Sequence, residues 1–585
     1  MISRFKTLSV NQFTFITALF YVAIFNLPLF GIVRKGIEKQ PEVDPLFIAS
    51  MPLFLTFALS FLFSIFTVKY LLKPFFIVLT LLSSSVFFAA YQYNVVFDYG
   101  MIENTFQTHP AEALMYVNLA SITNLLLTGL LPSYLIYKAD IHYQPFFKEL
   151  LHKLAFMLLM FVGIGIVAFF YYQDYAAFGR NNSELRRYIV PTYFVSSASK
   201  YLNEHYLQTP MEYQQLGLDA KNASRNPNTK PNLLVFVVGE TARSMSYQYY
   251  GYNKPTNAHT QNQGLIAFND TGSCGTATAV SLPCMFSRMG RADYDPRRAN
   301  AQDTVIDVLS HSGIKVQWFD NDSGCKGVCD QVENLTIDLK SDPKLCSGQY
   351  CFDQVLLNKL DKILAVAPSQ DTVIFLHIIG SHGPTYYLRY PPEHRKFIPD
   401  CPRSDIQNCS QEELINTYDN TILYTDFILS EVVNKLKGKQ DMFDTAMLYL
   451  SDHGESLGEK GMYLHGAPYS IAPKEQTSVP MLAWVSNDFS QDNQLNMTCV
   501  AQRAEQGGFS HDNLFDSLLG LMNVKTTVYQ SQLRVFNILC QPIIGQYGHP
   551  VCRGNGSIAV TASDSSSGWA ASSVLMPATY RRITA

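Results

Sequence analysis

Five long apolar segments fill the first 172 residues of this 585-residue chain and constrain its fold more than any other feature. They run over about residues 11–33, 46–68, 74–96, 115–137 and 153–172. Each is long enough to cross about 30 Å of hydrocarbon as a helix. Buried core helices are the alternative, but five such runs in succession favour a membrane domain. The first is not a cleavable signal peptide, because it lacks a small-residue cleavage site and further spans follow it.

The positions of lysine and arginine indicate the orientation of these spans. Arg4 and Lys6 precede the first span, and the loops after the second and fourth spans are also basic, whereas the loop 97–114 contains no Lys or Arg. The loop after the first span is basic too and goes against this pattern. The balance predicts a cytoplasmic N-terminus and, with five spans, places the chain after residue 173 on the outer side.

All eleven cysteines lie at or beyond residue 274, in the half of the chain that follows the apolar segments. Eight form close pairs, at 274/284, 325/329, 346/351 and 401/409. Local pairing of this kind predicts disulfides in an oxidising compartment, which agrees with the orientation above. A metal cluster is the alternative, but the irregular spacings do not match a zinc ribbon. The small net charge of −4 gives no reason to expect a nucleic-acid partner.

From about residue 231 the pattern is that of a soluble α/β protein. Nearly continuous apolar runs end in polar residues: PNLLVFVVGE, GIKVQWFDND, DTVIFLHIIGSHGP and TAMLYLSDHGE. Such runs, separated by helical stretches, predict a mostly parallel sheet with helices on both faces. Polar residues after parallel strands gather at one edge of the sheet, so four of them could converge there. These residues are Glu240, His382, Asp452 and His453.

Residues 173–230 connect the two halves, and their stretch RRYIVPTYFVSSASKYL carries aromatic and basic residues. This composition fits a helix that lies along the membrane interface, and an ordinary linker helix fits equally well.

The residue types at these strand ends suit a metal ion. Glu240, Asp452 and His453 offer carboxylate and imidazole ligands of the kind that zinc accepts. A helix cap or a solvated side chain is the ordinary alternative for the glutamate, and a hydrogen-bonded polar group is the ordinary alternative for a histidine.

The segment SCGTATAVSLPC, residues 273–284, places three hydroxyl side chains between two cysteines. Zinc can lower the pKa of a bound hydroxyl, so Thr276, Thr278 or Ser281 could act as a nucleophile. Hydroxyl residues near helix starts are also common caps. The residues alone leave the three hydroxyls equivalent.

Five motifs carry a resemblance to a known family. VVGETAR, SCGTATAVSLPCMFS, DNDSGCKGVC, HIIGSHGP and SDHGESLGE…YLHGAP, in this order behind five spans, resemble the lipid A phosphoethanolamine transferases of Gram-negative bacteria. This family includes chromosomal enzymes and the mobile colistin-resistance enzymes. The resemblance covers about residues 10–540. It implies an α/β fold in which a five-helix transmembrane domain precedes a periplasmic domain of the alkaline phosphatase and sulfatase type.

The resemblance also implies domain boundaries. We expect a transmembrane domain over 1–172, a periplasmic connector with an interfacial helix over 173–230, and a catalytic domain over 231–540. The tail 541–585 is rich in Ser, Ala and Gly, which predicts disorder or an altered reading frame. We expect Cys499 to pair with Cys540 and Cys552 to stay free.

Site roles follow from the resemblance, residue by residue. The family's nucleophile corresponds to Thr278, and its zinc ligands correspond to Glu240, Thr278, Asp452 and His453. A second zinc would lie near His382, His465 and Glu455, and the phosphate pocket would contain Lys326. The ethanolamine head group would be held by Asn104, Thr108 and Glu112. Asp322 stands where some members have Asn, and it would contact the substrate.

The implied reaction moves phosphoethanolamine from phosphatidylethanolamine to a phosphate of lipid A. Thr278 would carry the group covalently, and His465 or His382 would protonate the departing diacylglycerol. Zinc is the implied cofactor, with one tight site and room for a second. The protein would work as a monomer among the lipids of the inner membrane. Lipid A with less negative charge would bind cationic polymyxins less well.

Three alternatives stay open at this stage. The lipoteichoic acid synthases also join five spans to an outer domain with a threonine nucleophile, but they transfer glycerol phosphate and lack this cysteine pattern. A related phosphoethanolamine transferase could act on another envelope glycan. A non-catalytic lipid-binding membrane protein is the third, and the intact set of motif residues argues against it.

Overall fold

The computed structural model describes residues 7–37, 44–223, 229–366, 370–536, 542–544 and 550–552. The chain divides into two compact units, Met1–Cys540 and Gln541–Ala585. The described part of the second unit is an antiparallel pair, β16 (Pro542–Ile544) and β17 (Pro550–Cys552). The rest of the expected tail lies outside the described residues. The boundaries expected near residues 172 and 230 stay predictions.

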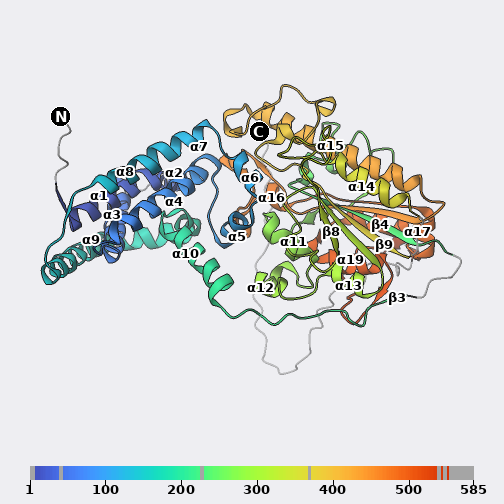
Figure 1. Cartoon of the computed structure of the whole chain (residues 1–585), viewed down its shortest axis with the longest axis horizontal. Coiled ribbons are helices and arrows are strands. Elements are labelled where there is room, and N and C mark those ends of the chain that lie inside the picture. The colour runs from blue at the N-terminus through green and yellow to red at the C-terminus, as the bar shows by residue number, and fades with distance from the viewer. Residues whose placement is uncertain are drawn as a thin grey trace, which may run out of the picture. The chain divides into compact units, whose positions relative to one another are not determined.

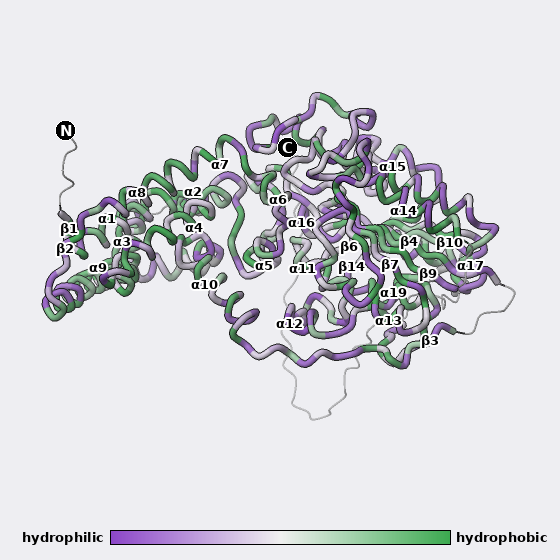
Figure 2. Tube along the Cα trace, viewed as in Figure 1, coloured by the Kyte–Doolittle hydropathy of each residue, from purple (hydrophilic) through white to green (hydrophobic). Residues whose placement is uncertain are grey.

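The N-terminal region contains the predicted apolar helices. Four described helices are long and apolar enough to cross a membrane, and a bent pair, Val10–Phe25 with Leu27–Lys35, makes a fifth if it is counted as one span. The helical elements are α1 (Val10–Phe20), η1 (Tyr21–Phe25), α2 (Leu27–Ile37), α3 (Pro45–Ile65), α4 (Leu72–Tyr93), α7 (Leu119–Asn124), η2 (Leu125–Leu130), α8 (Leu131–Lys138) and α9 (Phe146–Asn181). Figure 2 shows hydrophobic residues along these helices, and many of their Leu and Phe side chains are exposed, as expected of a surface that faces lipid.

The first span differs from a straight helix because it bends by 52° at Asn26. Pro28 follows two residues later and has no N–H for the helical hydrogen bond, which is a usual cause of a kink. The buried Asn26 amide donates to the carbonyl oxygens of Tyr21 and Val190, and its Oδ1 accepts from the Val190 N–H. The bend is therefore held by the chain that follows the last span.

Two short helices, α5 (Tyr99–Gln107) and α6 (Pro110–Met115), form the loop between the third and fourth spans. α5 contacts α10 (Thr192–Leu202) of the connector and α11 (Thr278–Phe286) of the soluble half. The loop without positive charge therefore reaches the soluble half.

The soluble half is built on a seven-stranded sheet with the order β5-β13-β10-β4-β9-β7-β8. The strands are β4 (Asn232–Gly239), β5 (Ile266–Ala267), β7 (Lys315–Asp320), β8 (Glu333–Thr336), β9 (Thr372–His377), β10 (Asp444–Ser451) and β13 (Met481–Val485). β10, β4, β9, β7 and β8 pair in parallel, while β13 and β5 are antiparallel. The predicted mostly parallel sheet is confirmed, and four of its strands are the four apolar runs.

Helices cover both faces of this sheet (Figure 1). α13 (Val305–His311), α19 (Leu514–Leu521) and α11 pack with the side chains of one face, and α14 (Gln354–Leu364) and α15 (Gln411–Lys437) pack with those of the other. β4, between β10 and β9, is completely buried along its eight residues. Burial on two faces explains why its sequence does not alternate between apolar and polar residues.

Four of the expected cysteine pairs are disulfides: Cys274–Cys284, Cys325–Cys329, Cys346–Cys351 and Cys401–Cys409. Cys499 is also disulfide-bonded, and Cys540, its expected partner, lies outside the described residues. The Cys552 side chain lies outside them as well.

Candidate active site

Two neighbouring parallel strands bring the candidate metal ligands together. Ser451 of β10 pairs with Gly239 of β4, so Glu240 and Asp452 follow the strands side by side. The Asp452 N–H donates to the Gly239 carbonyl oxygen at 2.9 Å, which continues the ladder by one bond. Glu240, Asp452 and His453 are all fully buried.

The three side chains form a group that could hold a divalent cation. Their ligand atoms all lie within 4.8 Å of one another. His453 Nε2 is 3.6 Å from Glu240 Oε1 and 3.4 Å from Asp452 Oδ2. His453 Nδ1 lies 2.9 Å from the Gly454 carbonyl oxygen and donates to it, which leaves the Nε2 lone pair directed at the carboxylates. Among the described residues Asp452 Oδ2 has no hydrogen-bond donor.

The electrostatics of the group agree with a cation. Burial, with Asp452 beside it, raises the pKa of Glu240 to about 7. Burial also raises the pKa of Asp452. Burial and the neighbouring His465 lower the pKa of His453 to about 4, so its imidazole is neutral. Burial disfavours the charged form of both carboxylates, and a bound cation would offset the cost of their negative charge.

The three hydroxyls between Cys274 and Cys284 have different surroundings. Thr278 Oγ1 donates to Glu240 Oε2 at 3.1 Å and lies 3.4 Å from His453 Nε2. Thr276 Oγ1 donates to the Ala467 carbonyl oxygen at 2.6 Å, and Ser281 Oγ donates to the Asp452 carbonyl oxygen. Only Thr278 of these three therefore contacts the side chains of the candidate ligand group.

Thr278 is the first residue of α11, and Ala277 before it is extended. The α11 N–H groups are therefore next to the hydroxyl, where they would favour a phosphate oxygen. Gly275 allows this turn, because a Cβ there would lie 2.9 Å from the Ser281 nitrogen.

His465 and His382 lie near the candidate ligand group. The rings of His453 and His465 have centroids 4.4 Å apart, and those of His465 and His382 are 5.9 Å apart. Glu455 accepts from Tyr386 on Oε1 and lies 2.9 Å from His465 Nδ1 on Oε2. Burial alone would lower the pKa of His465, but the Glu455 carboxylate raises it.

The structure does not bring His382, His465 and Glu455 into a compact ligand set. It brings together a different second group, Glu240, Asp322 and His377, whose ligand atoms also lie within 4.8 Å. His377 was not among the residues singled out in the sequence. Its position in the sequence is the signal that could identify it, because His377 is the last residue of a buried strand, five positions before His382.

His377 is oriented by Asp320 of the neighbouring strand β7. Its Nδ1 lies 2.8 Å from Asp320 Oδ2, which also accepts from the Trp318 indole N–H at 3.0 Å. Among the described residues His377 Nε2 has no hydrogen-bond partner. Burial opposes the charge on His377, but Asp320 raises its pKa to about 9.

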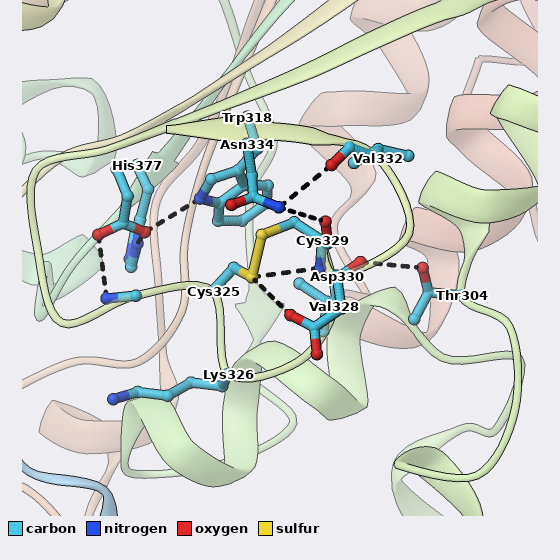
Figure 3. Close-up of a disulfide and its surroundings, with 12 residues drawn as sticks. Thr304, Trp318, Cys325, Lys326, Val328, Cys329, Asp330, Val332, Asn334 and His377 are labelled. Carbon is cyan, nitrogen blue, oxygen red and sulfur yellow. Dashed lines mark hydrogen bonds and ion pairs between the residues drawn. A yellow bond between two sulfur atoms is a disulfide. The ribbon is translucent and has the colours of Figure 1, made fainter. Parts of the chain in front are cut away.

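Lys326 lies in the loop closed by the Cys325–Cys329 disulfide and extends away from it (Figure 3). Its Nζ donates to the Ser323 carbonyl oxygen at 3.0 Å and to the Gln107 carbonyl oxygen at 3.4 Å. Lys326 therefore ties this loop to the end of α5. Cys325, Cys329 and Asp330 are also close enough to hold a metal ion, but the disulfide occupies both sulfurs.

A cavity of about 610 Å³ lies between this loop, the site and the membrane-side helices. Its lining includes Asp322, His382, Arg389, His109 and Met115. The expected head-group residues Asn104 and Thr108 are on α5 and just after it, where Thr108 Oγ1 donates to the Asn104 carbonyl oxygen. They do not line this cavity. The Glu112 side chain lies outside the described part of the chain.

Asp353 is a second residue that sequence reasoning missed. It is fully buried at the start of α14 and accepts from Asn321 Nδ2, from the Ile379 N–H and from the Gly380 N–H at 2.8, 2.8 and 3.0 Å. Burial raises its pKa to about 6. It holds the turn that leads to His382, and nothing in its local sequence distinguishes it from an ordinary helix cap.

A two-sided α/β sheet with carboxylates, histidines and a hydroxyl at its strand ends defines an enzyme of the alkaline phosphatase and sulfatase class. Residues 232–524 match the sulfatase family, and residues 55–206 match the family described as phosphoethanolamine transferase EptA/EptB. The chain belongs to the EptA/Mcr family of phosphoethanolamine transferases, because it is similar to members of this family over most of its length.

The chain is 40% identical over 519 residues to phosphoethanolamine transferase EptA of Salmonella typhimurium, covering 88% of this chain and 94% of that protein. It is 35% identical to phosphatidylethanolamine transferase Mcr-2 of Escherichia coli, covering 88% and 96%. Among solved structures, the integral membrane protein lipooligosaccharide phosphoethanolamine transferase A of Neisseria meningitidis matches with a TM-score of 0.86 at 35% identity, covering 89% of this chain and 97% of that one. The chain is thus a multi-pass membrane protein with a soluble C-terminal domain.

Proposed function

We propose that this protein transfers phosphoethanolamine from phosphatidylethanolamine to a phosphate of lipid A, through a covalent intermediate on Thr278. One observation carries the proposal: the Thr278 hydroxyl, at the start of α11, contacts both Glu240 and His453. The relatives support the substrates, since one is named for phosphatidylethanolamine and another for lipooligosaccharide. The enzyme would work as a monomer in the inner membrane, with its soluble domain in the periplasm.

The residues present fit a zinc ion. Glu240, Asp452 and His453 would hold it, with Thr278 as the fourth ligand, and Asp452 Oδ2 and His453 Nε2 are the atoms left available for it. When bound, zinc would lower the pKa of the Thr278 hydroxyl and offset charge on the phosphoryl oxygens. The group Glu240, Asp322 and His377 could hold a second cation once His377 has lost its proton, since a histidine ligand must be neutral.

In the first step Thr278 Oγ1 would pass its proton to Glu240 Oε2, 3.1 Å away, and attack the phosphorus of phosphatidylethanolamine. The bond from phosphorus to the diacylglycerol oxygen breaks, and that oxygen takes a proton. His465, whose Nδ1 lies 2.9 Å from Glu455 Oε2, or His382 would donate this proton. The cavity lined by Asp322 and His382 would hold the head group, and Lys326, in the loop that also carries Ser323 and Gly324 of the lining, would bind its phosphate.

In the second step an oxygen of a lipid A phosphate would attack the phosphorus of the intermediate. The bond to Thr278 Oγ1 breaks and the phosphoethanolamine remains on lipid A. Two displacements of moderate difficulty replace a single harder one. The added amine lowers the net negative charge of lipid A, so cationic polymyxins would bind the outer membrane less strongly.

Mass spectrometry of lipid A tests the proposal. Cells that express the wild type should gain lipid A with added phosphoethanolamine and become less susceptible to polymyxin, and cells that express Thr278→Ala should gain neither. Addition to another envelope glycan in place of lipid A would favour the alternative acceptor. Modification by Thr278→Ala at the wild-type level would disprove the nucleophile.

Metal analysis of the purified protein tests the zinc site separately from activity. The wild type should contain zinc, and Asp452→Asn should lose most of it. Asp361→Asn is the matched control, since Asp361 is exposed and paired with Lys435. Equal zinc in Asp452→Asn and the wild type would refute this ligand set.

A further inference from the structure

A second, smaller cavity lies where α5 meets the start of α11. Its volume is about 190 Å³, and it shares no lining residue with the cavity beside His382. The lining includes Asp98, Glu103, Thr276, Arg291, Tyr294 and Tyr469. None of these six residues has a role in the reaction proposed above.

The surrounding protein leaves the hydrogen bonding of the Glu103 carboxyl group incomplete. The residue is 2% exposed, and among the described residues its Oε2 has no hydrogen-bond donor. Its Oε1 lies 3.9 Å from His205 Nε2, which is too long for a hydrogen bond. A buried carboxylate oxygen without a donor is costly, so a ligand that donates to it would gain binding energy.

Arg291 supplies the opposite charge on the same cavity. Its guanidinium lies 4.1 Å from the centroid of the Tyr469 ring, and it forms no ion pair among the described residues. Tyr294 lies within electrostatic reach of both charges: burial raises the pKa of its hydroxyl, Glu103 adds to the rise and Arg291 opposes it. Among the described residues, the cavity therefore offers a carboxylate oxygen without a donor and a guanidinium without an ion pair, near one tyrosine.

The cavity wall is also connected to the reacting groups. The Gly466 N–H donates to the Thr276 carbonyl oxygen at 2.6 Å, and Thr276 Oγ1 donates to the Ala467 carbonyl oxygen at 2.6 Å. These bonds join the residues just before Thr278 to those just after His465. A ligand in the cavity would contact both loops at once.

We propose that this cavity is a second binding site for a phosphoethanolamine zwitterion, with the ammonium on Glu103 and the phosphate on Arg291. An ammonium group carries the donors that Glu103 lacks, and a guanidinium matches phosphate oxygens. The source is either the free group or the head of a phospholipid. The charge pattern stands without the proposed function, but the choice of this zwitterion rests on it.

The first test measures binding to the full-length, metal-loaded protein in detergent. Radiolabelled phosphoethanolamine should bind at two sites on the wild type. Glu103→Gln and Arg291→Gln should each weaken one of the two by about tenfold or more and leave the other unchanged. Ethanolamine should lose affinity only in Glu103→Gln, and inorganic phosphate only in Arg291→Gln. Glu505→Gln and Arg298→Gln, at exposed positions, are the matched controls.

The second test measures occupancy of the cavity by chemical labelling of Glu103. A hydrophobic carbodiimide should label Glu103, and mass spectrometry should find this labelling reduced when phosphoethanolamine is added. In vesicles, phosphatidylethanolamine should protect Glu103 and phosphatidylglycerol should not, if the occupant is a lipid head group. Protection by the free compound alone would assign the site to the free group.

A single binding site in the wild type, or two sites that neither variant changes, would overturn the inference, and so would labelling of Glu103 that no phosphoethanolamine compound reduces. These failures differ from failure of the proposed function, which appears as unmodified lipid A. A wild type that modifies lipid A but binds one phosphoethanolamine contradicts only the second site.

Discussion

For single residues, the proposed transfer reaction depends on which hydroxyl contacts the carboxylates of the candidate ligand group. Thr276, Thr278 and Ser281 are all buried, but two of them donate to main-chain carbonyl oxygens and only Thr278 donates to Glu240. The difference comes from position: Thr278 begins a helix directly above the strand end that carries Glu240. The hydroxyls of Thr276 and Ser281 act as structural ties.

Replacing each threonine by isosteric valine separates these two roles. Thr278→Val should reduce phosphoethanolamine transfer by at least about a thousandfold, because the nucleophile is lost. Thr276→Val should lose one hydrogen bond, about 1 kcal/mol of stability, and retain transfer within about tenfold. A purified transfer assay with a fluorescent phosphatidylethanolamine, alongside melting temperatures, measures both. Equal loss of transfer in the two variants would contradict the assignment.

At the element scale, strand register and one buried carboxylate place the site. The parallel pairing of β4 with β10 puts Glu240 beside Asp452, and Asp353 at the start of α14 holds the turn after β9. Gly380 in this turn has φ +49°, and a Cβ there would lie 2.7 Å from the Glu240 carbonyl oxygen. The His382 turn and the metal-ligand strand end are therefore in direct contact.

Asp353→Asn tests the support for the His382 turn. The new amide would direct N–H groups at main-chain N–H groups that now donate to the carboxylate, at a cost of about 1–3 kcal/mol. The variant should melt at a lower temperature and transfer more slowly while it keeps its zinc. Asp361→Asn, on the exposed side of the same helix, is the control. Wild-type stability and rate in Asp353→Asn would exclude this role.

Glu103 of α5 should make the stability of the protein depend on pH. Burial, with Glu204 nearby, raises the pKa of Glu103 from 4.5 to about 7. A raised carboxyl pKa contributes stability that is present below pH 4.5 and is lost as the pH rises through about 7. Glu103→Gln removes this loss, so its stability relative to the wild type should rise by up to about 3 kcal/mol between about pH 5 and 8. Differential scanning fluorimetry across this pH range measures the stability of both proteins, with Glu505→Gln as the control. A stability difference between Glu103→Gln and the wild type that does not change with pH would contradict the prediction.

At the scale of the whole molecule, one chain combines apolar helices with a soluble half that carries every cysteine. Disulfides at four described pairs are typical of a protein in an oxidising compartment. α5 and α6, between the third and fourth spans, contact the soluble half, so they must lie on the same side of the membrane as that half.

Protease treatment of spheroplasts tests this topology. Protease added outside should digest the soluble half and leave an N-terminal tag protected, because the tag is on the cytoplasmic side. Non-reducing mass mapping of the same sample should recover the four described disulfides. A soluble half that is digested only after the membrane is permeabilised would reverse the orientation.

The sequence by itself determined the apolar helices, the mostly parallel sheet, the cysteine pairs and the family, because these depend on local composition, periodicity and motif spacing. The bend at Asn26 also has a local signal in Pro28. Only the folded structure decided which hydroxyl contacts Glu240 and which carboxylate each histidine contacts. It also decided that Asp353 supports a turn 26 residues away. It also placed Glu103, whose Oε2 has no donor among the described residues, in the same cavity as Arg291. These contacts join residues far apart in the chain, and their distances depend on strand register and helix packing, which no local pattern encodes.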